Sequence, residues 1–287
     1  MGRRPRRRRV PRPRGRRDGR RHPHDGGDRG YGDAAQHHPG AGVKVSVVIP
    51  ALNEEATVAG VVRAVLGDGP DEVLVIDADS TDRTVEQAAA AGATVLNWRE
   101  ILPDIPPRPG KGESLWRGVA AAAGDVVVFI DADLRQPGSG MVGKLAAPFA
   151  DPAVHLVKAD YQRTINGRPT GGGRVTELTA KPLLRALFPA LAHINQPLAG
   201  EYAIRRATAL ELPFTDGYGV EAGLLVDVAA RHGASSVRQV DLGVRRHRNR
   251  PLEELGPMAD VVAATLLEKA GAGAGGVGKR PALSGIL

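Results

Sequence analysis

Cysteine is absent from the 287 residues of this sequence. The chain therefore forms no disulfide and offers no thiolate, either as a nucleophile or as a zinc ligand. Any bound metal ion must be held by oxygen and histidine nitrogen, which favours a hard divalent cation. Aromatic residues are scarce, at 3%, whereas the 42% of apolar and 25% of charged residues are typical of a globular protein.

Long apolar runs are lacking as well. The longest run, at residues 45–52, is interrupted by Pro50 and is shorter than the roughly 18 residues that a membrane-spanning helix needs. The Arg-rich start has no apolar segment of the kind that a secretion signal carries. We therefore expect a soluble cytoplasmic protein that does not insert into a membrane.

Positive charge is concentrated at the N-terminus. The formal net charge is +7, but residues 1–42 contain 13 Arg and 4 Asp, and the remaining residues carry 26 basic and 28 acidic side chains. Residues 1–42 have almost nothing to bury, so we expect a disordered arm. The arm is either a solvated tail or a contact for nucleic acid or another anionic surface. Nucleic-acid binding is expected of no other part of the chain.

Short apolar runs alternate with helical periodicity from residue 43 onward. Strands are predicted at residues 44–49, 72–76, 93–96, 125–130, 156–161, 201–205 and 236–242. Helices are predicted at residues 54–66, 81–91, 112–123, 173–187, 220–232 and 255–269. This alternation predicts an α/β fold with a mostly parallel sheet and helices on both faces. Residues 271–287 are rich in Gly and Ala and are predicted to form a flexible tail.

Acidic side chains follow the predicted strands, at the sheet edge where α/β proteins bind ligands. Asp131 and Asp133 come directly after the strand at residues 125–130. Such a pair can hold a divalent cation together with a sugar or phosphate group, and carboxylate oxygens suit Mg²⁺ or Mn²⁺. The pair is equally compatible with a turn and a helix cap. Glu221 begins a predicted helix, either as a capping carboxylate or as a partner for a hydroxylated substrate.

Two further loops have both a structural and a functional interpretation. Residues 77–82 are acidic and begin a predicted helix, and Asp77 could accept hydrogen bonds from a nucleobase or a ribose. Residues 50–55 form a rigid turn with carboxylates in the first turn of a helix, where the helix dipole stabilises them. The backbone of Ala51 and Leu52 could also contact a base.

Positively charged segments could bind anions. Lys111 lies between glycines at the start of a predicted helix, in a segment that lacks the Walker sequence. It could offset charge on a diphosphate, or it could be a surface lysine. Glycines 171–173 precede Arg174 at a helix start, where free N–H groups bind anions, or they form a hinge. His247, in an Arg-rich stretch, is a candidate nitrogen ligand for a cation held by Asp133.

Together these segments resemble one family, the actinobacterial glucosyl-3-phosphoglycerate synthases, which are retaining glycosyltransferases with a GT-A fold. The resemblance covers residues 45–267 in the family's order. The matching segments read VSVVIPALNEE, DADSTD, RPGKGESLWRG, VVVFIDADL, GGGRVTEL, QPLAGEY, GYGVE and LGVRRHRNRPL. It implies a GT-A domain over residues 43–270, with a nucleotide-binding half at 43–135 and an acceptor-binding half at 136–270.

The resemblance also implies substrates, a cofactor and site residues. The donor would be UDP-glucose, the acceptor 3-phosphoglycerate, the cofactor Mg²⁺ or Mn²⁺, and the assembly a homodimer. The donor would contact Pro50, Ala51, Leu52, Glu54, Ser80, Lys111, Asp131, Leu198 and Glu221. The acceptor would contact Gly173, Arg174, Thr176 and Asn249, and the metal would be held by Asp133 and His247. Lys111, Asp131 and Glu221 would be catalytic.

Some features depart from the family pattern, and other functions compete. Asp79 stands where the family often has glycine, and the segment at residues 161–171 is short. A related synthase that uses GDP-mannose to make mannosyl-3-phosphoglycerate would have the same scaffold. A protein that binds nucleic acid through its arm, or a nucleotide-binding scaffold without activity, belongs to a different class. Neither of these explains the aspartate pair together with Lys111 and His247.

Overall fold

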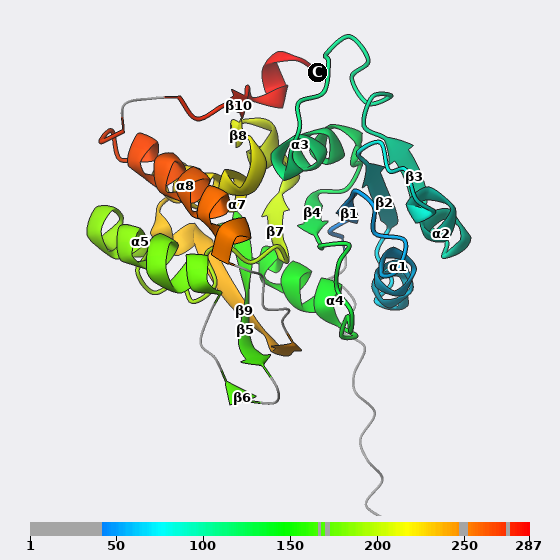
Figure 1. Ribbon diagram of the computed structural model, residues 1–287, viewed down its shortest axis with the longest axis horizontal. Coiled ribbons are helices and arrows are strands. Elements are labelled where there is room, and N and C mark those ends of the chain that lie inside the picture. Colours follow the sequence, from blue (N-terminus) through cyan, green and yellow to red (C-terminus); the bar gives the residue numbers. More distant parts are fainter. Residues whose placement is uncertain (1–41, 166–167, 170–172, 247–251, 274–275) are drawn as a thin grey trace, which may run out of the picture. The chain divides into compact units, whose positions relative to one another are not determined.

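The computed structural model describes residues 42–165, 168–169, 173–246, 252–273 and 276–287. A mixed β-sheet passes through this part of the chain (Figure 1). Its strands are β1 (Val45–Ala51), β2 (Glu72–Asp77), β3 (Thr94–Asn97), β4 (Val126–Phe129), β5 (Leu156–Ile165), β6 (Arg168–Pro169), β7 (Tyr202–Arg205) and β9 (Val237–Arg246). Their order is β3-β2-β1-β4-β7-β5-β6, and β9 pairs with β5.

Most neighbouring strands are parallel. Strands β3, β2, β1 and β4 run in the same direction, and β9 runs parallel to β5. Strand β7 is antiparallel to both of its neighbours, β4 and β5, and β6 is antiparallel to β5. The predicted, mostly parallel sheet is therefore confirmed. Strands β4 and β7 join the two predicted halves of the domain within one sheet.

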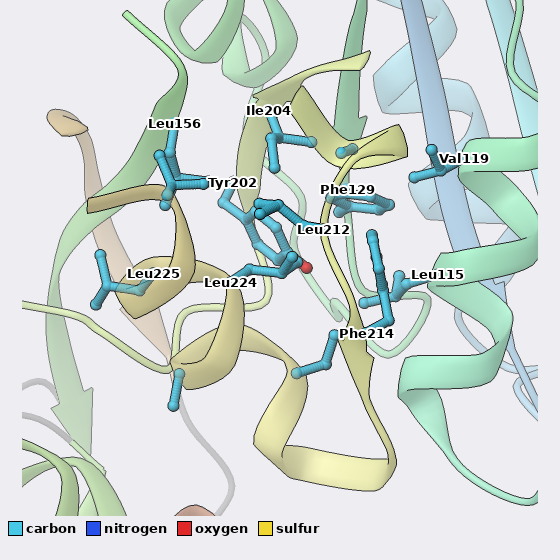
Figure 2. Close-up of a cluster of buried hydrophobic side chains, with 14 of the residues drawn as sticks. Leu115, Val119, Phe129, Leu156, Tyr202, Ile204, Leu212, Phe214, Leu224 and Leu225 are labelled. Carbon is cyan, nitrogen blue, oxygen red and sulfur yellow. The ribbon is translucent and has the colours of Figure 1, made fainter. Parts of the chain in front are cut away.

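Helices cover both faces of the sheet. They are α1 (Val58–Gly67), α2 (Thr84–Ala90), α3 (Lys111–Ala121), α4 (Met141–Ala146), α5 (Lys181–Leu187), α6 (Arg206–Leu210), α7 (Val220–His232) and α8 (Leu252–Lys269). Side chains of α1, α2 and α4 share one hydrophobic cluster with one face of the strands. Side chains of α3, α5, α6, α7 and α8 share a second cluster with the other face, part of which Figure 2 shows.

Alternation along the strands explains the two clusters. Val47 and Val48 are neighbours in β1, yet they belong to different clusters, because successive side chains of a strand point to opposite faces. Both side chains are fully buried. A strand buried on both faces is mostly apolar, as β1 is apart from Ser46, and such strands are typical of parallel sheets between helices.

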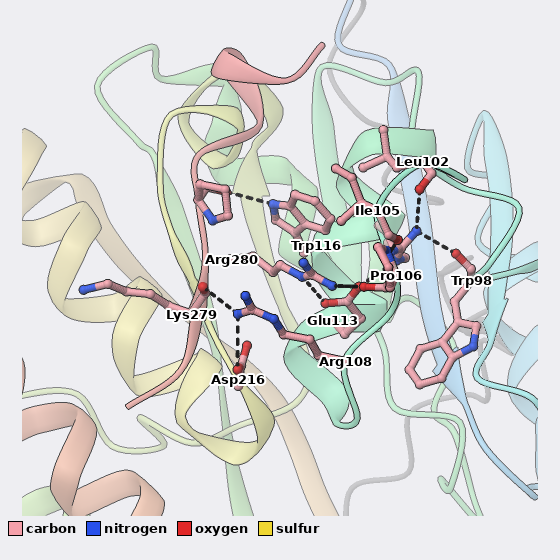
Figure 3. Close-up of polar contacts among 12 residues, drawn as sticks. Trp98, Leu102, Ile105, Pro106, Arg108, Glu113, Trp116, Asp216, Lys279 and Arg280 are labelled. Atoms are coloured by element: carbon pink, nitrogen blue, oxygen red, sulfur yellow. Dashed lines mark hydrogen bonds and ion pairs between the residues drawn. The ribbon is translucent and has the colours of Figure 1, made fainter. Parts of the chain in front are cut away.

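The C-terminal segment differs from its prediction as a flexible tail. Strand β10 (Lys279–Arg280) pairs with β8 (Phe214–Thr215), and Leu283 is fully buried. The Arg280 side chain forms an ion pair with Glu113 of α3 (Figure 3). The expected flexible tail at residues 271–287 is therefore wrong for residues 276–287. Its order depends on a buried ion pair with a distant helix, which the Gly- and Ala-rich composition does not reveal.

Two further expectations concern the N-terminal arm and membrane insertion. The predicted arm at residues 1–42 lies outside the described residues except for Gly42, so its disorder stays a prediction. Among the described residues, no helix is both long and apolar enough to cross a bilayer.

Candidate active site

A cleft opens where the parallel strands β1, β2 and β4 end. Its volume is about 390 Å³. Seven residues that the sequence analysis singled out line it: Pro50, Ala51, Leu52, Glu54, Lys111, Asp131 and Asp133. Three other side chains in its lining are not among the predicted site residues: Trp98, Ser114 and Tyr218. Trp98 directly follows β3, so its position after a strand was the available signal.

The loop after β2 braces the turn after β1. Asn53 has a positive φ of 56°, and its backbone N–H donates to Ser80 Oγ at 2.9 Å. The N–H of Thr81 donates to Asn53 Oδ1, also at 2.9 Å. Ser80, a predicted donor contact, is not in the lining of the cleft. It instead fixes the turn that carries Ala51 and Leu52.

The acidic residues at 77–82 serve this loop as well. Asp77 is buried, and its carboxylate accepts the N–H of Ser80. Asp82 accepts the N–H of Thr84 at 2.9 Å, where α2 begins, and the N–H of Glu55 at 3.1 Å. Asp77 is not in the cleft lining. These hydrogen bonds favour the structural interpretation of the acidic cluster.

Lys111 joins two carboxylates from distant parts of the chain. Its Nζ lies 2.5 Å from Asp131 Oδ1 and 2.7 Å from Glu221 Oε1. Lys111 is the first residue of α3, Asp131 follows β4, and Glu221 is in the first turn of α7. Only 18% of the Lys111 side chain is exposed, so it is not a surface lysine. We call Lys111, Asp131 and Glu221 the Lys111 triad.

The triad keeps Lys111 charged. Burial lowers the pKa of Lys111, but the carboxylates of Asp131 and Glu221 oppose burial and hold that pKa well above its ordinary value. An ammonium group so close to two carboxylates forms charge-assisted hydrogen bonds to both. The site therefore presents a fixed positive charge beside carboxylate oxygens that can accept hydrogen bonds.

Glycines allow the backbone to approach the triad. A Cβ atom at Gly200, just before β7, would overlap the carboxylate of Asp131. A Cβ at Gly112, directly after Lys111, would overlap the carbonyl oxygen of Thr215 in β8. Close packing is therefore the reason for glycine at both positions. It places the start of α3 against β8 and the segment before β7 against Asp131.

Asp133 is exposed in the cleft wall, two residues after Asp131. Its carboxylate oxygens are hard donors that suit Mg²⁺ or Mn²⁺, which proteins often hold through one or two carboxylates together with substrate phosphates. The other predicted ligand, His247, lies outside the described residues. Within the described ranges, no three His, Cys, Asp or Glu side chains come together to hold a metal. A cation at Asp133 must therefore share its ligands with a substrate or with residues beyond these ranges.

The predicted acceptor residues Gly173, Arg174 and Thr176 lie where a helical segment begins, after β6 in the chain. Helical structure starts at Arg174, continues as a π-helical turn (η2, Thr176–Ala180) and leads into α5. Arg174 is exposed, whereas Thr176 is buried. The structure thus keeps Gly173, Arg174 and Thr176 together. Asn249 lies outside the described residues.

Leu198 and Lys158 lie outside the lining of the cleft. Leu198 is half-buried and packs against the hydrophobic cluster of α3 and α7, and it is not in the lining of the cleft. Lys158, which the sequence analysis did not single out, is almost fully buried in β5. The signal for Lys158 was a lysine between apolar residues of a predicted strand.

Comparisons with known proteins indicate the family of the chain. Residues 46–210 match the family described as glycosyl transferase family 2. The glucosyl-3-phosphoglycerate synthase of Mycolicibacterium paratuberculosis is 51% identical over 249 residues, covering 83% of this chain and 76% of that protein.

Solved structures are similar as well. The crystal structure of glucosyl-3-phosphoglycerate synthase from Mycobacterium tuberculosis in complex with Mn²⁺, UDP-glucose and phosphoglyceric acid is 45% identical, with a TM-score of 0.80. The match covers 88% of this chain and 94% of that one. A second structure of the same enzyme contains Mn²⁺, UDP and glucosyl-3-phosphoglycerate. It has the same identity and TM-score and covers 88% of this chain and 95% of that one.

Proposed function

Because the chain belongs to glycosyl transferase family 2, we propose that it transfers glucose from UDP-glucose to 3-phosphoglycerate, giving glucosyl-3-phosphoglycerate and UDP. One observation carries this proposal: Lys111 and Asp131 line the cleft at the ends of the parallel strands together with Asp133, and Lys111 is also paired with the buried Glu221. The relatives named for this reaction are similar over most of this chain and most of their own length.

The turn after β1 binds the uridine. Leu52 is an apolar side chain that is 54% exposed in the cleft lining, and a nucleobase would cover it favourably. Pro50 and Ala51 supply backbone groups at the same place, and Glu54 supplies a carboxylate. Ser80 acts through the turn, because its hydroxyl holds Asn53.

The Lys111 triad holds the diphosphate and the glucose. The ammonium group of Lys111 offsets negative charge that grows on the departing UDP. The carboxylates of Asp131 and Glu221 fix that ammonium group and accept hydrogen bonds from sugar hydroxyls. Leu198, the remaining predicted donor contact, packs against the hydrophobic cluster of α3 and α7.

Asp133, with His247 as the second predicted ligand, holds the divalent cation. A bound Mg²⁺ or Mn²⁺ supplies positive charge that stabilises the diphosphate as it leaves. The acceptor phosphate binds where helical structure starts after Gly173. Backbone N–H groups at the N-terminus of a helix and the guanidinium of Arg174 favour an anion at that place, with Thr176 and Asn249 as the further predicted contacts.

The chemistry is a substitution at the anomeric carbon of glucose. The 2-hydroxyl oxygen of 3-phosphoglycerate forms a bond to this carbon, and the bond from the carbon to the UDP oxygen breaks. Both triad carboxylates are paired with Lys111, so neither is placed as a nucleophile that attacks the sugar. We therefore expect attack on the face from which UDP departs, with the departing phosphate accepting the hydroxyl proton and the anomeric configuration retained.

The test is UDP release by the full chain with UDP-glucose, 3-phosphoglycerate and Mg²⁺ or Mn²⁺, each omitted in turn, with mass spectrometry of the product. We expect turnover only when all three are present. Parallel reactions with GDP-mannose test the mannosyl alternative. UDP release that does not depend on 3-phosphoglycerate, or no transfer from UDP-glucose, would contradict the proposal.

A homodimer also belongs to this proposal, on the strength of the family resemblance. Light scattering coupled to gel filtration should give twice the chain mass of 30.1 kDa. A mass equal to one chain at assay concentrations would contradict the dimer without affecting the proposed reaction.

A further inference from the structure

Lys158 is an ammonium group in the interior of the protein. Only 1% of the residue is exposed. Its Nζ donates a hydrogen bond to the carbonyl oxygen of Ala199 at 2.8 Å and lies 4.3 Å from the centroid of the Tyr202 ring. Tyr202 is its antiparallel partner in β7. Within the described part of the chain, Lys158 makes no direct ion pair, although a buried lysine is rare without one.

A purely structural role does not explain this lysine. Leu156 and Tyr202, which belong to the same face of the sheet, are part of the hydrophobic cluster. An apolar side chain would fit there without the cost of desolvating a charge. A charge kept at a place where it weakens the fold is typical of residues that serve function.

The contact with Ala199 connects Lys158 to the Lys111 triad. Ala199 precedes Gly200, whose backbone lies so close to the Asp131 carboxylate that a Cβ would overlap it. Lys158 therefore holds the segment that limits the position of Asp131. Without this hydrogen bond, the buried carbonyl of Ala199 would lose its partner.

Charged groups from several elements also face Lys158. They are Lys111 of α3, Asp131 after β4, Glu201 before β7 and Glu221 of α7. Burial lowers the pKa of Lys158 to about 7, with Lys111 lowering it further and the three carboxylates opposing the change. The hydroxyl of Tyr202 is neutral, because burial raises its pKa well above the ordinary value.

We propose that Lys158 is a positioning residue for glucose transfer. Through the carbonyl of Ala199 it fixes the backbone against Asp131, and its ammonium charge offsets the carboxylates around Lys111. This inference rests on the proposed function, since it concerns the same cleft. It assigns no contact between Lys158 and a substrate.

The test compares Lys158→Met, Lys158→Arg and Val157→Ala with the unmodified chain. Val157 is the matched control, because it is equally buried in β5 but belongs to the cluster on the opposite face of the sheet. We expect Lys158→Met to remain folded by circular dichroism and to lose at least tenfold in kcat. Its KM for 3-phosphoglycerate should stay within twofold. Lys158→Arg, which keeps the charge, should recover part of the loss, and Val157→Ala should keep its kcat within twofold.

A pH profile separates positioning from simple loss of stability. The kcat/KM for UDP-glucose reports groups of the free enzyme, and in the unmodified chain it should fall as the pH rises through about 7. Lys158→Met should not show this step. If the Met variant does not fold, the profile of the unmodified chain and that of Lys158→Arg decide the question. No step near pH 7 in the unmodified chain would overturn the inference.

The outcomes separate this inference from the proposed function. An unmodified chain that transfers glucose, with a Lys158→Met variant of unchanged kcat, overturns the role of Lys158 alone. The role of Lys158 is also overturned if Lys158→Met and Val157→Ala lose activity in the same proportion to their loss of stability. An unmodified chain without glucose transfer overturns the proposed function, and the inference falls with it.

Discussion

Replacing Glu113 with Gln should destabilise the fold more than replacing Arg280 with Met. Glu113 is 1% exposed and pairs with two arginines, Arg117 of α3 at 2.7 Å and Arg280 of β10. Arg117 also donates to backbone carbonyls of residues 98, 101, 102 and 105. Figure 3 shows this network between the C-terminal segment and the loop before α3. One carboxylate thus serves two buried guanidinium groups.

The loss in the free energy of unfolding depends on which buried charge loses its partner. Glu113→Gln leaves two buried cations without a carboxylate, and breaking a buried pair in this way costs about 3–5 kcal/mol. Arg280→Met leaves the pair between Glu113 and Arg117 intact. It removes hydrogen bonds to Glu113 and to the carbonyl of Pro106, while Met keeps much of the apolar volume, so we expect about 2 kcal/mol. The double variant should cost less than the sum, because only one cation then remains.

The assay is urea unfolding followed by circular dichroism and by tryptophan fluorescence. Trp98 and Trp116 are the two tryptophans of the chain. The Arg117 guanidinium donates to the carbonyl of Trp98, and Arg280 lies 5.1 Å from the ring of Trp116. Coincident transitions would support two-state analysis. A cost of Arg280→Met that equals or exceeds that of Glu113→Gln, or strict additivity in the double variant, would refute the reasoning.

Three further predictions concern the proposed metal ligand Asp133, the proposed acceptor residue Arg174 and the buried Lys158. Asp133→Asn should lower turnover about 100-fold or more and shift its metal dependence while leaving the melting temperature unchanged, because Asp133 is exposed; an unchanged metal titration would contradict its role. Arg174→Ala should raise the KM for 3-phosphoglycerate about tenfold, the loss of roughly 1.4 kcal/mol of binding, with an unchanged KM for UDP-glucose; a larger change in the donor KM would place the phosphate elsewhere. Burial lowers the pKa of Lys158 from 10.5 to about 7. Between pH 7 and 10 the unfolded chain therefore binds more protons at this lysine than the folded chain does. The free energy of unfolding should rise with pH over this range, by roughly 3 kcal/mol. Urea midpoints measured over this range should rise in the unmodified chain and stay flatter in Lys158→Met, and equal slopes would contradict the low pKa.

The parallel half of the sheet could be predicted from the sequence because its strands are buried on both faces. Strand β4 is entirely apolar and β1 is apolar apart from Ser46. Residues that follow these strands, Leu52 and Asp131 among them, line the cleft as expected from their position. The direction of β7 could not be read, because a strand of four residues has the same pattern in either direction. Residues whose hydrogen-bond partners lie in a distant segment could not be predicted either.

Arg280 and Ser80 illustrate that difficulty. Arg280 is separated from Glu113 by 167 positions in the sequence. From the sequence alone, an arginine in a Gly-rich terminus is predicted to be exposed to solvent. The resemblance implies that Ser80 contacts the donor, and in the structure its hydroxyl accepts the N–H of Asn53, 27 positions earlier. In both cases the side chain is satisfied by a long-range hydrogen bond, and no local pattern encodes such a bond.

The first turn of α3 connects the C-terminal segment to the cleft. Lys111 and Glu113 are two residues apart, about 200° around a helix, so they point in opposite directions. Lys111 reaches Asp131 and Glu221, while Glu113 holds Arg280. In the same C-terminal segment, the carbonyl oxygen of Gly278 accepts a hydrogen bond from the N–H of Asp216. Asp216 directly precedes the cleft residue Gly217. Residues 276–287 therefore contact both the first turn of α3 and the residue before Gly217, and we expect the ion pair of Arg280 to contribute to the position of Lys111.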